Sequence, residues 1–308
     1  MRRKALWMAF ATTLLWSGSY ILNKLAFQGG VGPLTLSGMR YLLAGAILLL
    51  LQAGKGRGRA RESGARLPLP MTLALGLLGY AVAQGLQYAG QKFLTPTQSS
   101  LCLSVGNTAL VMAVDRLWLR ENQSRLDWLK LLLMLTGITL YYSPFGDVGF
   151  SSVGILLMAL SSVGYALHMT LNRRLLVKHR YPASELVARP MIVGAALLLA
   201  VGLCVEGLPA VTLNLLLILM YLSAVSGALG FTLWTRSQKE LTAFESSGIN
   251  NLMLIEIALM DFLFFGRAFT VWQIAAIALV FGSVVWIQVG RGGNRAPKEP
   301  ARKDISRH

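Results

Sequence analysis

The sequence predicts an all-α membrane protein with ten transmembrane helices, arranged as two inverted five-helix repeats. Three observations lead to this fold class. The chain of 308 residues is 55% hydrophobic and only 14% charged, whereas a soluble domain carries about 25% charged residues. The apolar residues gather in blocks of about 20, the length that crosses the roughly 30 Å hydrocarbon core of a bilayer. Several sequence patterns also occur twice, once in each half of the chain.

The predicted spans form two groups of five, with short connections between most of them. In the first half we expect helices over Ala5–Phe27, Leu34–Ala53, Leu69–Gly90, Thr95–Leu117 and Leu126–Tyr142. In the second half we expect them over Val153–Arg173, Ser184–Val205, Leu213–Thr235, Leu241–Phe265 and Val271–Val289. The chain therefore divides into a first repeat over residues 1–145, a second, inverted repeat over 146–290, and a tail over 291–308 with too few apolar residues to fold, which we expect to be disordered and cytoplasmic.

The formal charge of +16 indicates membrane topology rather than a nucleic-acid partner. Positively charged residues are retained on the cytoplasmic side during insertion. With a cytoplasmic N-terminus, the predicted cytoplasmic segments hold all Lys and Arg residues except Lys24, Arg40, Lys92, Arg189 and Arg267. We therefore expect a multi-pass protein of the bacterial cytoplasmic (inner) membrane, monomer or homodimer, with both termini in the cytoplasm.

The clearest repeat is the stretch "QKFLTPTQSS" at Gln91–Ser100, which returns as "QKELTAFESS" at Gln238–Ser247. Five predicted spans separate the two copies. Because this number is odd, the copies are expected on opposite sides of the membrane. Arg40 and Arg189 form a second pair, since each begins an Arg-x4-Gly motif followed by an apolar run. Inverted repeats are the architecture of many secondary transporters, which bind substrate near the membrane midplane where the halves meet.

A third repeat is a helical stripe of polar and aromatic residues with the spacing i, i+4, i+7, i+11. It covers Trp16, Tyr20, Asn23 and Phe27 in the first span and Ser161, Tyr165, His168 and Asn172 in the sixth. Glycines such as Gly137 and Gly282 are expected to permit close packing of neighbouring helices.

Three segments resemble a known family: "LLWSGSYILNKLAF" at 14–27, "GPLTLSGMRYLLAG" at 32–45 and "TPTQSSLCLSVGNTALVMAVDRLWLRE" at 95–121. They are similar to helices 1, 2 and 4 of EamA-type carriers in the drug/metabolite transporter superfamily. The resemblance implies a ten-helix fold in which helices 1–4 and 6–9 surround a substrate cavity, helices 5 and 10 lie outside it, and metabolites are exported. The sequence departs from the family pattern at Asn107 and near Leu254, where mid-helix prolines are usual, and at Arg267, where helix 9 usually closes with an acid.

The candidate substrate-binding residues are polar or aromatic side chains inside the predicted spans. Uncharged polar side chains in lipid must find partners, so they either join neighbouring helices or line a wet cavity. For His168 in particular, a packing role stays open beside a binding role. The candidate set comprises Trp16, Tyr20, Asn23, Arg40, Tyr80, Gln84, Asn107, Tyr165, His168, Arg189 and Trp234.

Two kinds of charged residue stand out within the spans. Arg40 and Arg189 are expected to face the interior, because an intramembrane charge costs about 2.5–3.5 kcal/mol on insertion scales and needs a partner or water. The alternative for Arg189 is an ion pair with Glu185, one turn earlier. Glu256 lies near the centre of the ninth span with no basic residue within two turns.

A carboxylate at that depth is costly in its charged form, so Glu256 is the candidate site for proton coupling or for a cationic substrate. Glu245 lies eleven residues earlier on nearly the same helix face and belongs to the same candidate set. The alternative for Glu256 is a buried pair with an arginine of another helix.

We expect no enzyme activity, cofactor or metal site, because the sequence contains no HExxH, GxSxG or P-loop motif and its two cysteines lie in separate spans. The prediction is a secondary active transporter that exports small metabolites, amino acids or amphiphilic compounds, by alternating access. Its partners would be a small-molecule substrate, the lipid bilayer and protons as coupling ion. One alternative is a carrier or flippase for an anionic solute or lipid head group, suggested by Lys24, Arg40 and Arg189. The other is a membrane-embedded enzyme or structural partner.

Overall fold

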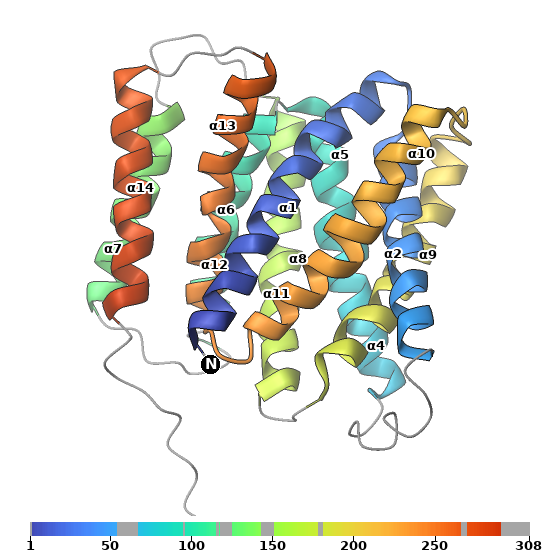
Figure 1. Cartoon of the computed structure of the whole chain (residues 1–308), viewed down its shortest axis with the longest axis horizontal. Helices are drawn as coiled ribbons and strands as arrows, with labels where there is room; N and C mark the ends of the chain where they lie inside the picture. Colours follow the sequence, from blue (N-terminus) through green and yellow to red (C-terminus); the bar gives the residue numbers. More distant parts are fainter. Residues whose placement is uncertain are drawn as a thin grey trace, which may run out of the picture.

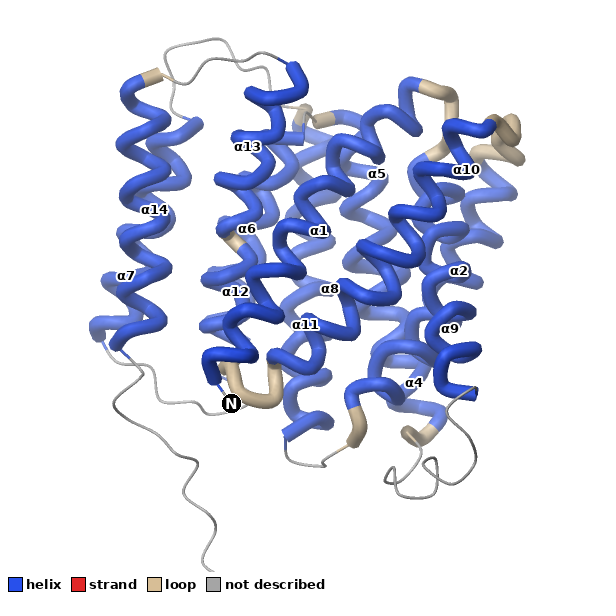
Figure 2. The backbone as a smooth tube through the Cα atoms, viewed as in Figure 1, coloured by secondary structure: helices blue, strands red, loops and turns tan. Residues whose placement is uncertain are grey.

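The regular structure of the chain is helical throughout the part that the structure, a computed structural model, describes (Figures 1 and 2). The described residues are 2–53, 67–94, 96–114, 117, 125–142, 151–177, 181–265 and 270–290. The predicted tail over 291–308, Arg267 and the long polar connection after the second span lie outside them.

The helices of each half follow one another in the order that the predicted spans require. The first half contains α1 (Arg2–Gln28), α2 (Pro33–Ala53), α4 (Leu69–Leu75), η1 (Gly76–Gln84), α5 (Gly85–Phe93), α6 (Pro96–Val114) and α7 (Arg125–Tyr142). The second half contains α8 (Ser152–Val177), α9 (Ala183–Val205), α10 (Leu213–Met220), η3 (Tyr221–Gly230), α11 (Phe231–Ser237), α12 (Ala243–Asn250), α13 (Leu252–Phe265) and α14 (Val271–Gly290).

Matching π-helical segments interrupt one long helix in each half. The segment η1 joins α4 to α5, and η3 joins α10 to α11. A π-helical turn runs its backbone hydrogen bonds to residue i−5, which shifts the side chains beyond it, and such turns are frequent at functional sites. Periodicity in the sequence did not predict these segments.

Six helical segments are long and apolar enough to cross a membrane, and they match six of the predicted spans: Arg2–Gln28, Pro33–Ala53, Leu69–Phe93, Ser152–Val177, Ser184–Val205 and Leu213–Ser237. Shorter apolar helices cover Trp128–Gly137, Gly248–Met260 and Val271–Ser283. The count of ten transmembrane helices therefore stays a prediction. The ninth predicted span is interrupted at Asn251, between α12 and α13, although the chain has no proline there.

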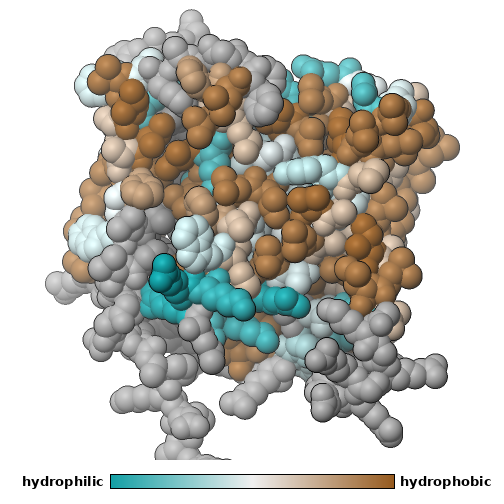
Figure 3. Space-filling view, viewed as in Figure 1, coloured by the Kyte–Doolittle hydropathy of each residue, from teal (hydrophilic) through white to brown (hydrophobic). Residues whose placement is uncertain are grey.

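The outer surface of the bundle is largely apolar, as a lipid environment favours. Large apolar side chains such as Leu50, Met220 and Leu263 are exposed on the helices. Figure 3 shows a mainly brown, apolar face with a teal, hydrophilic band near the end where α1 begins. A soluble protein rarely exposes apolar surface on this scale. Buried apolar clusters lie between helices of the two halves, for example around Tyr41 and Met191.

The two halves make reciprocal contacts. Helix α2 packs along α9, and α7 packs along α14. Helix α6 packs on α8, while α12 and α13, its counterparts in the second half, pack on α1. Segment η1 packs on α9, and η3 packs on α2. These contacts between the halves thus recur with the halves exchanged. The α7–α14 pair lies at one edge of the bundle (Figure 1), away from the other helices' common centre.

Glycines allow the close contact between α2 and α9. A Cβ atom on Gly38 would lie 2.6 Å from the backbone of Leu199, and one on Gly202 would lie 2.6 Å from the backbone nitrogen of Thr35. The expectation for Gly137 agrees with its surroundings, since a Cβ there would lie 2.9 Å from Val280. For Gly282 it was wrong, because a Cβ at that position would meet nothing within 4 Å.

The bundle has two ends, which we name from α1. The proximal end is where α1 begins at Arg2, and the distal end is where it finishes at Gln28. Figure 1 shows α8 running the opposite way, so that α8 ends at the proximal end. Helix α12 also begins there, because Glu245 in its first turn contacts Arg2.

Candidate functional site

A cavity of about 70 Å³ lies among the helices of both halves. Its wall is formed by α1, α2, η1, α5 and α6 of the first half and by α8, α11 and neighbouring residues of the second. Nine of the eleven candidate substrate-binding residues line it: Trp16, Tyr20, Asn23, Arg40, Gln84, Asn107, Tyr165, His168 and Trp234. The structure therefore brings together residues that are far apart in the sequence.

The other two candidates lie outside the cavity wall. The buried ring of Tyr80 packs behind the wall, with its centroid 5.5 Å from that of Tyr41 and 5.8 Å from that of His168. The side chain of Arg189 is 39% exposed, and its Nη1 lies 3.6 Å from the carboxylate of Glu185. Its position near the start of α9 lets it pair with a neighbour one turn earlier, so the geometry gives no support for a substrate contact.

Arg40 has a different environment from Arg189. Its side chain is buried, Nε donates to the carbonyl of Leu222 over 3.2 Å, and Nη2 donates to Oγ of Ser226 over 2.6 Å. Nη1 donates to the hydroxyl of Tyr88. The guanidinium also lies 4.8 Å from the ring centroid of Tyr41. The contacts to Leu222 and Ser226 come from η3, so the π-helical segment helps to hold the arginine at the cavity wall.

Aromatic rings form another part of the wall. The ring of Trp16 lies 4.9 Å from that of Phe231 and 5.2 Å from that of Trp234, and its Nε1 donates to the carbonyl of Ser226 over 3.0 Å. Sequence reasoning missed Phe231 and Tyr41 as lining residues. The signal was available, because Phe231 lies three residues before Trp234 and Tyr41 directly follows Arg40.

His168 combines lining and packing. Its Nδ1 lies 3.2 Å from the carbonyl oxygen of Leu75, at hydrogen-bonding distance, and the ring meets Tyr80 edge-on. Within the described residues, no group of three or more His, Cys, Asp or Glu side chains is placed to hold a metal ion.

Two similar amide pairs lie at the two ends of the cavity. At the distal end, Nδ2 of Asn23 donates to Oε1 of Gln91 over 3.0 Å. At the proximal end, Nδ2 of Asn172 donates to Oε1 of Gln238 over 2.8 Å. All four side chains are buried. Gln91 and Gln238 are the first residues of the two repeated ten-residue stretches, so the sequence repeat coincides with a repeated contact.

This contact changes the alignment of the two halves. The stripe in the sequence matched Asn23 with His168, whereas the hydrogen bonds match Asn23 with Asn172. The motif Leu22-Asn23-Lys24 then corresponds to Leu171-Asn172-Arg173. Residues four apart lie on the same helix face, so a stripe alone cannot distinguish alignments that differ by about one turn.

A wide vestibule of about 930 Å³ lies on the distal side of the first amide pair. Gln91 lines the vestibule, Asn23 lines the cavity, and Tyr20 lines both. The side chains of Lys24 and Glu206 also line the vestibule. The Asn23–Gln91 hydrogen bond and the ring of Tyr20 therefore stand between the cavity and the distal surface.

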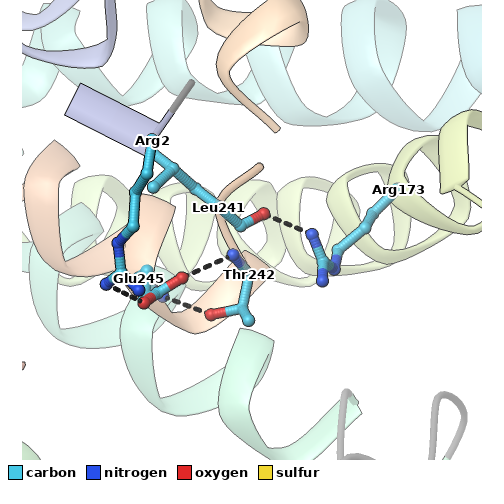
Figure 4. A network of polar contacts seen from close by, with 5 residues as sticks. All are labelled: Arg2, Arg173, Leu241, Thr242 and Glu245. Carbon is cyan, nitrogen blue, oxygen red and sulfur yellow. Dashed lines mark hydrogen bonds and ion pairs between the residues drawn. The ribbon is translucent and has the colours of Figure 1, made fainter. Parts of the chain in front are cut away.

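A polar network reinforces the proximal end (Figure 4). Nη1 of Arg173 donates to the carbonyls of Gln238, over 3.1 Å, and Leu241. The carboxylate of Glu245 accepts from Arg2 over 2.8 Å and from the backbone nitrogen of Thr242 over 2.8 Å. The backbone nitrogen of Glu245 donates in turn to Oγ1 of Thr242.

These reciprocal bonds make a capping box at the start of α12. Glu245, a candidate coupling residue, thus caps a helix and links it to α1. It does not line the cavity.

Glu256, the other coupling candidate, is buried between α13 and α1. Its two carboxylate oxygens accept hydrogen bonds from Oγ1 of Thr13, over 2.8 Å, and Oγ of Ser17, over 2.7 Å. The alternative interpretation was a buried pair between Glu256 and an arginine of another helix. In the part of the chain that the structure describes, two hydroxyl groups contact the carboxylate instead of an arginine. Glu256 does not line the cavity, but Ser17 directly follows Trp16, which does.

Comparisons with known proteins agree with this architecture. The EamA-like transporter family matches the chain twice, over residues 3–143 and 152–289. The uncharacterized transporter YyaM of Bacillus subtilis (strain 168) is 23% identical over 233 residues, which are 73% of this chain and 74% of that protein. A solved crystal structure is similar with a TM-score of 0.75 at 19% identity, covering 94% of this chain and 98% of the other. It supports the fold alone. Since the two matched segments span most of the sequence, the chain belongs to the EamA-like transporter family.

Proposed function

We propose that the protein is a secondary active transporter that exports small metabolites from the bacterial cytoplasm by alternating access. Family membership supports transport, a small-molecule substrate and a multi-pass membrane location. The direction, the energy source and the mechanism are our proposal. The observation that carries it is the pair of equivalent hydrogen bonds, Asn23–Gln91 and Asn172–Gln238, on opposite sides of one central cavity.

The halves act as inverted repeats in this proposal. The reciprocal contacts of α2 with α9 and of α7 with α14, and the opposite courses of α1 and α8, support an approximate twofold relation. Each of two inverted halves can adopt the conformation of the other half. One conformation opens the cavity at one end of the protein, and the exchanged conformation opens it at the opposite end. From the distribution of Lys and Arg, we assign the proximal end and both termini to the cytoplasmic side of the inner membrane. The distal end then lies on the outer side of this membrane.

The amide pairs have the strength that a reversible gate requires. A neutral hydrogen bond contributes only about 0.5–1.5 kcal/mol net, so either pair can break without loss of the fold. Breaking Asn23–Gln91 would join the cavity to the distal vestibule. Breaking Asn172–Gln238 would open it toward the cytoplasm. Transport requires that the two do not open together.

The proximal gate contains an ion pair in this structure. The Arg2–Glu245 ion pair is accompanied by a hydrogen bond from Arg173 to the backbone carbonyl of Gln238. In the aligned repeats, Lys24 stands in place of Arg173, and Gln98 stands in place of Glu245. A neutral Gln98 cannot form the corresponding ion pair. The wide distal vestibule agrees with a conformation that is held closed more firmly at the cytoplasmic end.

The test is the accessibility of the cavity from each side. Ser104 lines the cavity, so a cysteine placed there, after Cys102 and Cys204 are replaced by serine, reports access by a membrane-impermeant thiol reagent. We expect Asn23→Leu to increase modification from the distal side and Asn172→Leu to increase it from the proximal side, each several-fold. Leucine has a similar size to asparagine but cannot form the hydrogen bond. Equal modification from both sides in every variant would indicate a channel, and the alternating-access proposal would be wrong.

Uptake into proteoliposomes of the purified protein tests transport itself. Labelled metabolites should accumulate only when an ion gradient or an exchangeable internal substrate is supplied. A protein that moves none of a broad panel under either condition would favour the membrane-embedded enzyme or structural partner instead.

A further inference from the structure

The charges in the cavity wall favour an anion. Among the lining residues that the structure describes, Arg40 is the side chain that carries a full positive charge, and neither Asp nor Glu occurs. A cationic substrate would therefore find aromatic rings but no counter-charge in this wall. An anion would find the guanidinium of Arg40 at a position where only 3% of the residue is exposed.

Arg40 has no acidic partner in the described part of the chain. Its hydrogen-bond acceptors are the carbonyl of Leu222 and the hydroxyls of Tyr88 and Ser226, all neutral. Removal of a charge from water costs several kcal/mol unless an opposite charge compensates it. Other arginines of this protein do have carboxylates, as in the pairs Arg2–Glu245 and Arg189–Glu185.

The hydrogen bonds of Arg40 leave capacity for a ligand. A guanidinium has five N–H groups, and the three bonds to protein acceptors use one on Nε, one on Nη1 and one on Nη2. One N–H therefore remains on each terminal nitrogen. Guanidinium N–H groups form strong, charge-assisted hydrogen bonds with the oxygens of a carboxylate. The bonds to η3 and Tyr88 hold the guanidinium in place before a ligand arrives.

A second observation indicates a ligand in the same cavity. The side chain of Asn107 lines the wall and is buried, yet its Oδ1 has no hydrogen-bond partner. A buried polar atom without a partner costs about 1–3 kcal/mol. A substrate with a second polar group would satisfy it, while the rings of Trp16 and Trp234 would contact an apolar body.

We propose that Arg40 binds the carboxylate of a singly charged organic anion, and that such monocarboxylates are the substrates of this transporter. The proposal rests on the transport function above and specifies its substrate class. Because the described wall supplies one positive charge, it suits a monoanion better than a dianion. A phosphodiester, as in a lipid head group, shares the single negative charge and is distinguished by the experiment.

The experiment measures binding to the purified full-length protein in lipid nanodiscs, by quenching of tryptophan fluorescence, with thermal stability as a second readout. The probes are the matched pairs propionate and propionamide, and phenylacetate and phenylacetamide, together with phenethylamine and dimethyl phosphate. We expect each carboxylate to bind at least tenfold more tightly than its amide. The variant Arg40→Gln should lose this preference. The variant Arg189→Gln, the same substitution at the exposed arginine of the second half, should keep it.

Each other outcome contradicts the proposal. If no carboxylate binds more tightly than its amide, or if phenethylamine binds best, the cavity does not select anions. If dimethyl phosphate binds more tightly than every carboxylate, the site belongs to a phosphodiester. If Arg40→Gln stays folded and keeps the preference, the anion binds elsewhere. Should this variant fail to fold, the probe series on the unmodified protein still decides whether the protein prefers a carboxylate, an amine or a phosphodiester.

Transport is measured separately by counterflow in proteoliposomes. If carboxylates bind through Arg40 but are not transported, the proposed binding site is supported and the proposed transport function is refuted. Transport that proceeds equally with Arg40→Gln would support the transporter and refute the site.

Discussion

Arg40 and Glu256 show how a charged side chain is accommodated inside this bundle. The guanidinium of Arg40 meets a carbonyl and two hydroxyls, and the carboxylate of Glu256 meets the hydroxyls of Thr13 and Ser17. Both are held by neutral groups. Intramembrane charges of this kind are functional by default, and Arg40 lines the cavity while Glu256 contacts the helix turn that carries Trp16.

Glu256 is expected to make transport dependent on pH. In the described part of the chain, the groups within hydrogen-bonding or ion-pair distance of it are Thr13 and Ser17 of α1, and neither titrates near neutral pH. Uptake of H⁺ by the carboxylate would remove a charge from a low-dielectric site. The variant Glu256→Gln mimics the protonated form permanently. We expect the pH dependence of the transport rate to be lost in this variant, measured as uptake over a series of buffers of different pH.

Glu245→Gln is the matched control for this measurement. Its carboxylate caps α12 and pairs with Arg2, so the substitution should lower thermal stability by about 1 kcal/mol and leave the pH profile unchanged. An unchanged profile in Glu256→Gln would assign Glu256 a structural role.

At the scale of whole helices, the contact between α2 and α9 depends on two backbones that approach closely. The carboxylate of Glu206, just beyond α9, also accepts from the backbone nitrogens of Leu34 and Thr35 in the first turn of α2. A carboxylate is favourable at a helix N-terminus. These hydrogen bonds join α2 to the end of α9, and α2 also carries Arg40 of the proposed anion site.

Gly38→Ala should weaken the contact between α2 and α9. A Cβ at Gly38 would lie 2.6 Å from backbone atoms of Leu199, which cannot rotate away as a side chain can. Overpacking typically costs about 1–3 kcal/mol. Gly282→Ala is the control, because a Cβ there meets no atom within 4 Å. We expect a lower thermal unfolding temperature for Gly38→Ala alone, measured in the same detergent. Equal temperatures for both variants would show that α2 and α9 can separate without cost.

At the scale of the whole molecule, the proposed inverted topology places the two repeated stretches on opposite sides of the membrane. Lys92 and Lys239 follow Gln91 and Gln238 directly, and both side chains are exposed. Single cysteines at these positions, in a protein without Cys102 and Cys204, should react with an impermeant reagent from opposite sides. We expect position 92 to be labelled on intact cells and position 239 only after permeabilisation. Labelling of both positions in the same compartment would refute the inverted repeat.

Much of the fold and of the candidate site was predictable from the sequence, because it depends on local properties. Hydropathy determines which segments leave water, and six of the predicted spans correspond to long apolar helices. Helical spacing selects the residues that share a face, and nine candidates do line one cavity. The repeated stretch also identified Gln91 and Gln238 as equivalent, although their hydrogen-bond partners could not be read from it.

Only the tertiary structure decided which partner each charged side chain has and which helix supplies that partner. Arg40 and Arg189 begin the same motif, yet one is held in the cavity wall by η3 and the other pairs with Glu185 at an exposed position. The sequence predicted Glu245 and Glu256 on one helix face, yet in the structure one caps α12 beside Arg2 and the other lies on α13 and meets Ser17. Periodicity specifies a direction from the helix axis. The group found in that direction belongs to another helix, often more than two hundred residues away, and is determined by how the helices pack.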